Sequence, residues 1–114
     1  MRNGRGDVVF TPDPFKPGDD PRPWLILSAD SMPFPGEFLC AGLTHSEYVV
    51  NHELQSKHWA EGGLPPNEES YCSPWALGTI DSGDIRFVQG TVTDEFADKI
   101  ARDAIRYLEP ASAE

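Results

Sequence analysis

Few cysteines, few lysines and no long apolar run set the first limits on this sequence. Its 114 residues include only Cys40 and Cys72, so at most one intramolecular disulfide can form. No charged amino-terminal stretch precedes a long apolar segment, and no run is long enough to cross a bilayer. We therefore expect a cytoplasmic protein with one domain, residues 1–114, that does not enter membranes. We expect its thiols to be reduced and buried.

Positive charge is also scarce. The chain has 9 basic and 19 acidic residues, a net charge of -10, and its lysines are Lys16, Lys57 and Lys99. Such a surface repels nucleic acid at long range and does not attract anionic membranes. The charge has two explanations, which are solubility in a salt-rich cytoplasm and a site for a basic partner. Because the acids are scattered, solubility is favoured, and the composition resembles that of salt-loving organisms.

The common sequence signatures of catalysis and metal binding are missing. The chain has no phosphate-binding glycine loop, no nucleophile elbow and no paired-cysteine zinc motif. His45, His52 and His58 could be combined with Cys40 and Cys72, but their spacings match no tight pair of metal ligands. Ordinary core or surface roles are therefore favoured, and we expect neither a metal nor another cofactor.

The most informative stretch runs from Arg22 to Asp30. Pro23 lacks an N–H and suits the first position of a strand, and the four apolar residues 24–27 follow it without interruption. The run is too short for a typical helix, so it predicts a central strand buried on both faces. A charged guanidinium therefore stands at the entrance of a buried strand.

The rest of the chain predicts further strands joined by loops. The Pro-, Gly- and Asp-rich stretch 12–21 is a long connection, and 61–73 is a second loop. Gly42 indicates a bulge or a close backbone approach. Gly90 interrupts the last strand. The predicted strands are 7–11, 37–44, 47–51, 55–60 (slightly favoured over a loop), 74–80 and 85–92.

An amphipathic helix closes the chain. Thr93 is the expected N-cap, Asp94 and Glu95 suit the first turn, and apolar residues recur every three or four positions up to Leu108. Strands followed by one helix, without strand–helix alternation, predict a mainly β fold with α structure. We expect a small antiparallel barrel with the C-terminal helix packed at one side.

An ordered set of short motifs resembles the PemK/MazF family. The motifs are Gly6-Asp7-Val8-Val9, Arg22-Pro23 before the apolar strand, Leu43-Thr44 at the end of another strand, and Thr79-Ile80-Asp81 before a closing helix. The resemblance implies an SH3-like barrel and a homodimer. It also implies a toxin of a type II toxin–antitoxin pair, which cleaves single-stranded RNA without a metal and is neutralised by a cognate antitoxin protein.

The resemblance assigns catalytic roles to Arg22 and Thr44. Arg22 matches the family's catalytic arginine, which stabilises phosphoryl charge and is a candidate to protonate the leaving group. Its structural alternative is an ion pair with Asp19, Asp20 or Asp30. Thr44 matches the threonine that binds the scissile phosphate, and its alternative is a local bond to the backbone. The base is left unassigned.

Four neighbouring residues are candidates for RNA binding. Lys16 and Phe15 can contact a phosphate and stack on a base, although Phe15 can equally pin its loop to the core. His45 can act as base or acid, or stand idle on the surface, and Ser46 follows it directly.

Two departures from the family keep a second function open. The stretch from Gly18 to Arg22 is shorter than in the family, and Gly78 stands where many members carry an arginine. With the net charge of -10, the missing arginine favours a non-catalytic SH3-like barrel that binds a protein or peptide. A nucleic-acid-binding regulator without cleavage is the third and least favoured function.

Overall fold

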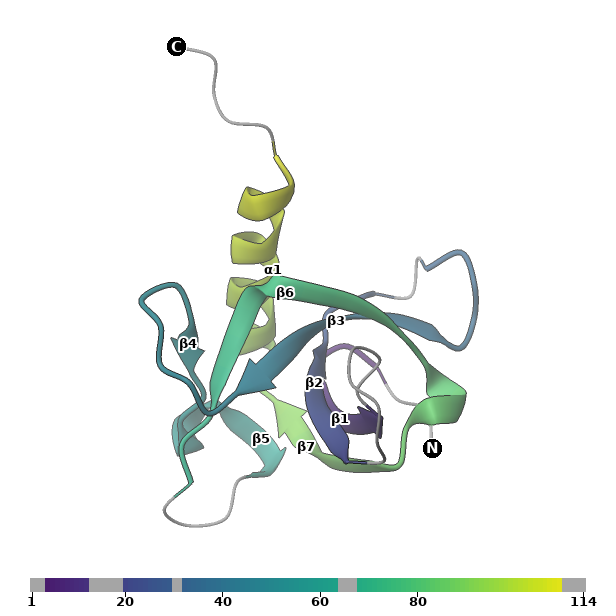
Figure 1. The fold of residues 1–114 in the computed structure, drawn as a ribbon, viewed down its shortest axis with the longest axis horizontal. Helices are drawn as coiled ribbons and strands as arrows, with labels where there is room; N and C mark the ends of the chain where they lie inside the picture. The colour runs from purple at the N-terminus through teal and green to yellow at the C-terminus, as the bar shows by residue number, and fades with distance from the viewer. Residues whose placement is uncertain (1–3, 13–19, 30–31, 64–67, 110–114) are drawn as a thin grey trace.

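The structure is a computed structural model that describes residues 4–12, 20–29, 32–63 and 68–109. Within these ranges, seven strands form one antiparallel sheet that curls into a partial barrel, and a helix follows them (Figure 1). The elements are β1 (Asp7–Pro12), β2 (Pro21–Ile26), β3 (Glu37–Thr44), β4 (His52–Glu53), η1 (Ser56–His58), β5 (Trp59–Gly62), β6 (Tyr71–Asp81), η2 (Ser82–Asp84), β7 (Phe87–Val92) and α1 (Asp94–Leu108). The predicted fold class, a small antiparallel barrel with a C-terminal helix, is confirmed.

Strand β2 occupies the middle of the sheet, as its apolar run predicted. The strand order is β4-β6-β3-β2-β1-β7-β5, so β2 lies between β1 and β3. Trp24, Leu25, Ile26 and Leu27 are all buried. Because successive side chains of a strand point to opposite faces, these residues enter two different cores.

The helix-side core is the larger of the two. Leu25 and Leu27 pack there with Val8, and with Phe96 and Ile100 of α1. The core on the other face combines Val9, Trp24, Ile26, Cys40 and Ile80. The sheet is therefore sealed on both sides around β2, and its register is fixed by two sets of apolar contacts.

Both cysteines are free and buried, as expected. Cys72 belongs to the helix-side core and Cys40 to the opposite one, so the two thiols lie on different faces of the sheet. Burial raises the pKa of Cys40 to about 12, and it raises the pKa of Cys72 as well. Thiolates are the reactive form of cysteine, so both side chains act as apolar packing groups.

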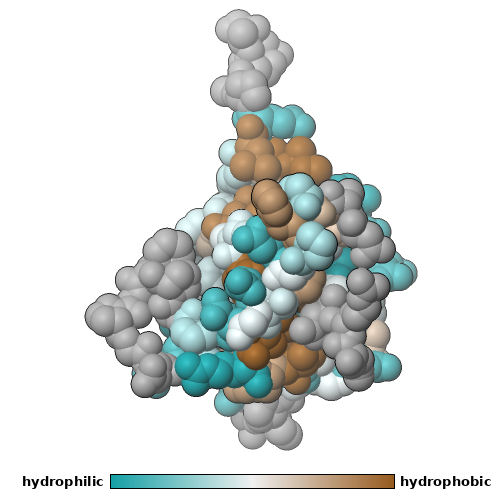
Figure 2. Space-filling model, turned by 90° about the vertical axis from the view of Figure 1, so that its right-hand side faces the viewer, coloured by the Kyte–Doolittle hydropathy of each residue, from teal (hydrophilic) through white to brown (hydrophobic). Residues whose placement is uncertain are grey.

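Helix α1 forms where the sequence predicted it. The hydroxyl oxygen of Thr93 accepts a hydrogen bond from the Phe96 N–H at 3.3 Å, which caps the first turn. The helix lies against β6 and projects beyond the sheet at its C-terminal end (Figure 1). There Ile105 and Leu108 are exposed, and brown side chains mark this end in Figure 2. No helix among the described residues is long and apolar enough to span a membrane.

The strand predicted at 47–51 is wrong. The segment is a turn, closed by a hydrogen bond from the Asn51 N–H to the Tyr48 carbonyl at 2.9 Å. Val49 is fully exposed, so its β-branched side chain has no sheet surface to pack on. Strand β4 starts only at His52 and pairs with β6.

The loop predicted at 61–73 is too long at both ends. Strand β5 continues to Gly62, and β6 already begins at Tyr71. The start of β6 at Tyr71 was not predicted, because proline is disfavoured inside a central strand and Pro74 follows closely. In the structure it lies in a bulge, since β3 pairs Ala41 with Leu77 but Gly42 with Ser73. The predicted irregularity at Gly42 is thereby confirmed.

Two further predictions were partly right. The segment 55–60 is not one strand, because Ser56–His58 form a 3₁₀ turn before β5. Strand β7 passes through Gly90 without ending there. A Cβ atom at Gly90 would lie 2.3 Å from the Glu61 carbonyl oxygen, so glycine is required where β5 and β7 pair closely.

Candidate active site

Arg22 and Thr44 lie at matching positions of neighbouring strands. The antiparallel register of β2 and β3 pairs Trp24 with Gly42. Arg22 and Thr44 lie two residues beyond this pair, each within its strand, and the same register continued to them would set Arg22 opposite Thr44. Both side chains then share the sheet face of Trp24. Directly opposite residues place their Cβ atoms about 5 Å apart. The juxtaposition follows from strand pairing alone.

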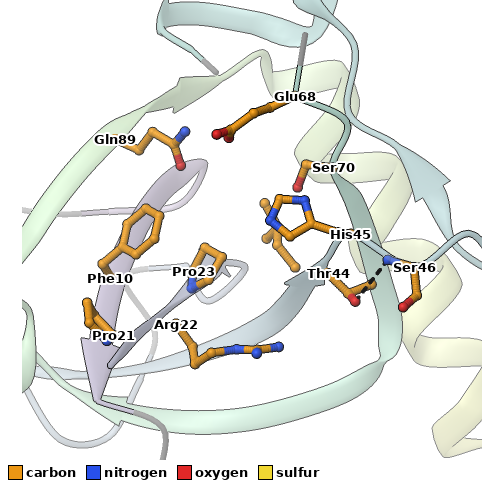
Figure 3. A pocket seen from close by; sticks show the side chains of 11 residues that line it. Phe10, Pro21, Arg22, Pro23, Thr44, His45, Ser46, Glu68, Ser70 and Gln89 are labelled. Carbon is orange, nitrogen blue, oxygen red and sulfur yellow. Dashed lines mark hydrogen bonds between the residues drawn. The ribbon is translucent and has the colours of Figure 1, made fainter. Parts of the chain in front are cut away.

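The two residues line a pocket of about 370 Å³. Figure 3 shows Arg22, Thr44 and His45 around the same space, with Glu68 and Gln89 on the opposite side. The walls come from β1, β2, β3, β7 and the segment that precedes β6. The lining residues are Phe10, Pro21, Arg22, Pro23, Leu43, Thr44, His45, Ser46, Glu68, Ser70 and Gln89.

The guanidinium of Arg22 is not engaged by a carboxylate in the described part of the chain. Arg22 is exposed, and the expected alternative of an ion pair with Asp20 is not formed there. Asp19 and Asp30, the other two alternatives, lie outside the described residues. The fork of N–H donors can therefore receive a ligand in the pocket.

Thr44 forms a local hydrogen bond to the backbone, the alternative that the sequence predicted for it. Its hydroxyl oxygen accepts the Ser46 N–H at 3.1 Å. This bond uses an acceptor lone pair, so the hydroxyl proton can still be donated to a ligand. The local bond also fixes the side chain and the turn that carries His45 and Ser46 into the pocket wall.

Within the described part of the chain, one side-chain hydrogen bond orients His45. Its Nδ1 lies 2.7 Å from the carbonyl oxygen of Glu69. A carbonyl oxygen only accepts, so Nδ1 carries the proton and Nε2 of the neutral ring is a free acceptor. Figure 3 shows the ring extending into the pocket. This tautomer suits a group that takes up a proton there.

Two glutamate carboxylates meet at the hydroxyl group of the buried Tyr71. The Tyr71 hydroxyl donates to Glu47 at 3.1 Å and lies 3.3 Å from Glu69. Burial, and then the Glu47 and Glu69 carboxylates, raise the pKa of Tyr71 to about 12. The phenol therefore keeps its single proton at neutral pH, and this proton is shared between the two nearby carboxylates.

Several pocket residues were missed by the sequence analysis. Gln89 reaches the pocket because it is the extra residue of a bulge, in which Val8 pairs with Gly90 and Val9 with Val88. Phe10 directly follows the Gly6-Asp7-Val8-Val9 motif in β1 but is not part of it, and Glu68 comes from a loop without a motif. Only Glu68, in an acidic stretch beside a predicted strand, gave a weak signal.

The outcome differs for the remaining candidates. Phe15 and Lys16 lie outside the described residues. Gly78 lies on β6 under the Trp24 ring, where an added Cβ would be 3.5 Å from the indole. Among the described residues no group of three or more His, Cys, Asp or Glu side chains could hold a metal ion.

Comparison with known proteins identifies the fold. No protein-family model matches the sequence, and the curated proteins give no match. Among solved structures, a mycobacterial endoribonuclease in complex with its cognate antitoxin matches with a TM-score of 0.65 at 18% identity, over 94% of this chain and 95% of the other.

Two further toxin structures agree with this match. The Mycobacterium tuberculosis toxin MazF-mt6 has a TM-score of 0.64 at 16% identity, over 90% of this chain and 95% of its own. The MazE–MazF structure from Deinococcus radiodurans has a TM-score of 0.64 at 16% identity, over 97% and 99% of the two chains. The chain thus has the PemK/MazF-like toxin fold.

Proposed function

We propose that this chain is a metal-independent endoribonuclease toxin that cleaves single-stranded RNA. The observation that carries the proposal is the pocket that Arg22, Thr44 and His45 line together, with Arg22 and Thr44 on the neighbouring strands β2 and β3. The fold shared with MazF-type endoribonucleases supports it.

The reaction uses the RNA itself as the nucleophile. The 2′-oxygen attacks the adjacent phosphorus, so an O2′–P bond forms and the P–O5′ bond breaks. The products are a 2′,3′-cyclic phosphate and a 5′-hydroxyl end. In this assignment His45 Nε2 takes the proton of the 2′-hydroxyl.

Arg22 and Thr44 act on the phosphoryl group. The guanidinium fork donates to the non-bridging oxygens, where negative charge grows in the transition state. The Thr44 hydroxyl donates to the phosphate and positions it. Since a guanidinium holds its protons tightly, we assign the proton of the departing 5′-oxygen to solvent.

The charge distribution favours a short single-stranded substrate. Arg22 is the only lysine or arginine among the described residues that line the pocket, and Glu68 stands on the opposite side. A long duplex would meet mostly acidic surface. Single strands can splay their bases and gain affinity by stacking and base contacts instead of phosphate pairing.

The partners of this function are a cognate antitoxin and a second copy of the chain in a cytoplasmic homodimer. Two of the structural neighbours contain an antitoxin or a MazE partner. An antitoxin with basic side chains suits this acidic toxin, because Glu68 in the pocket would pair with them.

A cleavage assay tests the proposal. Purified protein is incubated with single-stranded RNA and excess EDTA at low and high KCl, beside Arg22→Ala and Thr44→Ala. We expect cleavage by the wild type and a loss of about 10²- to 10³-fold in Arg22→Ala. Arg102→Ala, which removes an exposed arginine of α1, is the matched control and keeps full activity. A folded wild type that cleaves nothing at any salt concentration overturns the proposal.

A second candidate is a non-catalytic barrel that binds a basic protein or peptide. The specific observation in its favour is the acidic surroundings of the pocket, with Glu68 in its lining and Glu47 and Glu69 gathered at Tyr71. This function predicts tight binding of a lysine-rich peptide, weakened by Glu68→Gln, and no RNA cleavage.

A further inference from the structure

A second pocket adjoins the first along β2 and β3. Its volume is about 330 Å³, near the lower end of the range of about 300–1,000 Å³ for small-molecule sites. Arg22 and Thr44 line both pockets, so they stand between the two spaces. Three aromatic side chains line only the second one, Trp24 from β2, Tyr48 from the turn after β3, and Trp75 from β6.

Trp75 is exposed but held in place. It belongs to residues 74–76, which the bulge leaves without partners on β3. Its Nε1 donates to the Asn51 side-chain oxygen at 2.9 Å, and the Asn51 amide nitrogen in turn donates to the Ser46 carbonyl at 3.4 Å. An indole that is 47% exposed and hydrogen-bonded at one edge presents an oriented ring to the solvent.

Trp24 is the opposite case, because it is 7% exposed and its Nε1 is buried without a hydrogen-bond partner in the described part of the chain. Cβ atoms at Gly42 and Gly78 would lie 3.6 and 3.5 Å from its ring, so two glycines leave the space that the indole fills. A buried donor without an acceptor is costly. An acceptor carried by a ligand would remove that cost.

We propose that this pocket binds one nucleobase of the RNA, next to the phosphate held by Arg22 and Thr44. The inference rests on the proposed function, which supplies the phosphate position. A flat base can stack on the Trp75 and Tyr48 rings, as bases do on aromatic side chains of single-strand-binding proteins. Its carbonyl oxygen or ring nitrogen supplies the acceptor that the Trp24 indole lacks. An aliphatic peptide side chain offers neither the plane nor the acceptor.

Base stacking also answers the problem that the negative charge poses for RNA binding. Phosphate contacts weaken steeply with salt, and the described pocket residues offer a single arginine for them. Stacking on an indole depends on contact between two flat surfaces and is sequence-tolerant. The Trp24 donor then adds a preference for bases that present an acceptor to it.

The test measures whether the loss of affinity on removing the Trp75 side chain depends on the presence of one particular base. Short oligonucleotides with 2′-O-methyl groups, which lack the attacking hydroxyl, are labelled, and each base in turn is replaced by an abasic site. Binding is measured by fluorescence anisotropy. For the wild type, one abasic position should weaken binding about 5- to 150-fold, the usual contribution of a stacked base.

Trp75→Ala should weaken binding of the intact oligonucleotide by a similar factor and be insensitive to that abasic position. Trp75→Phe keeps a stacking ring and should retain most of the affinity. Trp24→Phe keeps the ring and removes the donor, so it should reduce discrimination between bases at that position. Tyr107→Ala, which removes an exposed tyrosine of α1, is the control and should match the wild type.

The inference is overturned if Trp75→Ala and the abasic site each weaken binding by the same factor whether or not the other change is present. A failure of the wild type to bind any oligonucleotide also overturns it. Cleavage of natural RNA is measured in parallel. If cleavage depends on Arg22 but the two binding losses are independent, the nuclease proposal holds and the base pocket is rejected. If the two binding losses are coupled but no RNA is cleaved, the base pocket holds and the nuclease proposal is rejected.

Discussion

Arg22 of β2 and Thr44 of β3 line the same two pockets, and each lies two residues beyond the pair formed by Trp24 and Gly42. Neither side chain is placed by a loop. Both belong to strands whose register is fixed by apolar residues on two faces. Sites on such rigid elements hold their geometry more accurately than sites on loops.

Arg22→Lys should reduce kcat about 10²-fold, although it keeps the positive charge. Lysine offers a point charge in place of the planar fork that bonds two phosphoryl oxygens at once. Single-turnover cleavage of a fluorogenic RNA measures the effect, with Arg106→Lys on α1 as the control. Full activity of Arg22→Lys would show that charge alone, and not the fork, matters.

His45→Gln tests the assignment of the proton acceptor. Glutamine can still donate an N–H to the Glu69 carbonyl, but it has no basic nitrogen to replace Nε2. We expect kcat to fall about 10²- to 10⁴-fold while KM changes little. Retained activity in a correctly folded variant would assign the base elsewhere.

Tyr71→Phe should change the alkaline limit of stability. Because the fold raises the pKa of Tyr71 to about 12, from its ordinary value of 10, the phenol contributes stability that is present below pH 10. This stability is lost as the pH rises from 10 towards 12. The difference in unfolding free energy between wild type and Tyr71→Phe, from urea titrations, should therefore shrink over this range.

A constant difference across the same pH range would contradict this account of Tyr71. At neutral pH the variant should be less stable than the wild type, because Glu47 loses its hydroxyl donor. Tyr107→Phe, at an exposed position, controls for the other tyrosines.

Gly90→Ala should destabilise the pairing of β5 with β7. The added methyl group would meet the Glu61 carbonyl at 2.3 Å, and backbone atoms cannot move aside as flexible side chains do. We expect a loss of about 1–3 kcal/mol, seen as a lower midpoint in thermal or urea unfolding. Gly4→Ala is the control, since a Cβ there meets nothing within 4 Å. Equal stability of both variants would mean that the two strands can separate locally.

The elements that could be predicted from the sequence are those whose signals lie within the element itself. Helix α1 carries its own cap at Thr93 and a repeating apolar face, and β3 has the predicted bounds Glu37–Thr44. The apolar run of β2 also predicted its central position. In each case the signal lies within the segment that forms the element.

What could not be predicted depends on contacts between distant segments. Pro74 fits inside β6 only because a bulge opposite Gly42 removes the need for its N–H. Gln89 reaches the pocket only because β1 and β7 pair irregularly. Valines at 49 and 50 indicated a strand, but none of the strands in the described residues pairs with them. Local composition carries none of this information.

The alternation along β2 also determines which sequence changes the site can tolerate. Arg22 and Trp24 share one face of the strand, while Leu25 packs under the helix on the other. Inserting or deleting one residue between Arg22 and Leu25 would turn the guanidinium to the wrong face or move apolar side chains out of their cores. Length variants within this strand should lose the fold and the site together, so relatives that keep the barrel should differ here by substitution and not by insertion.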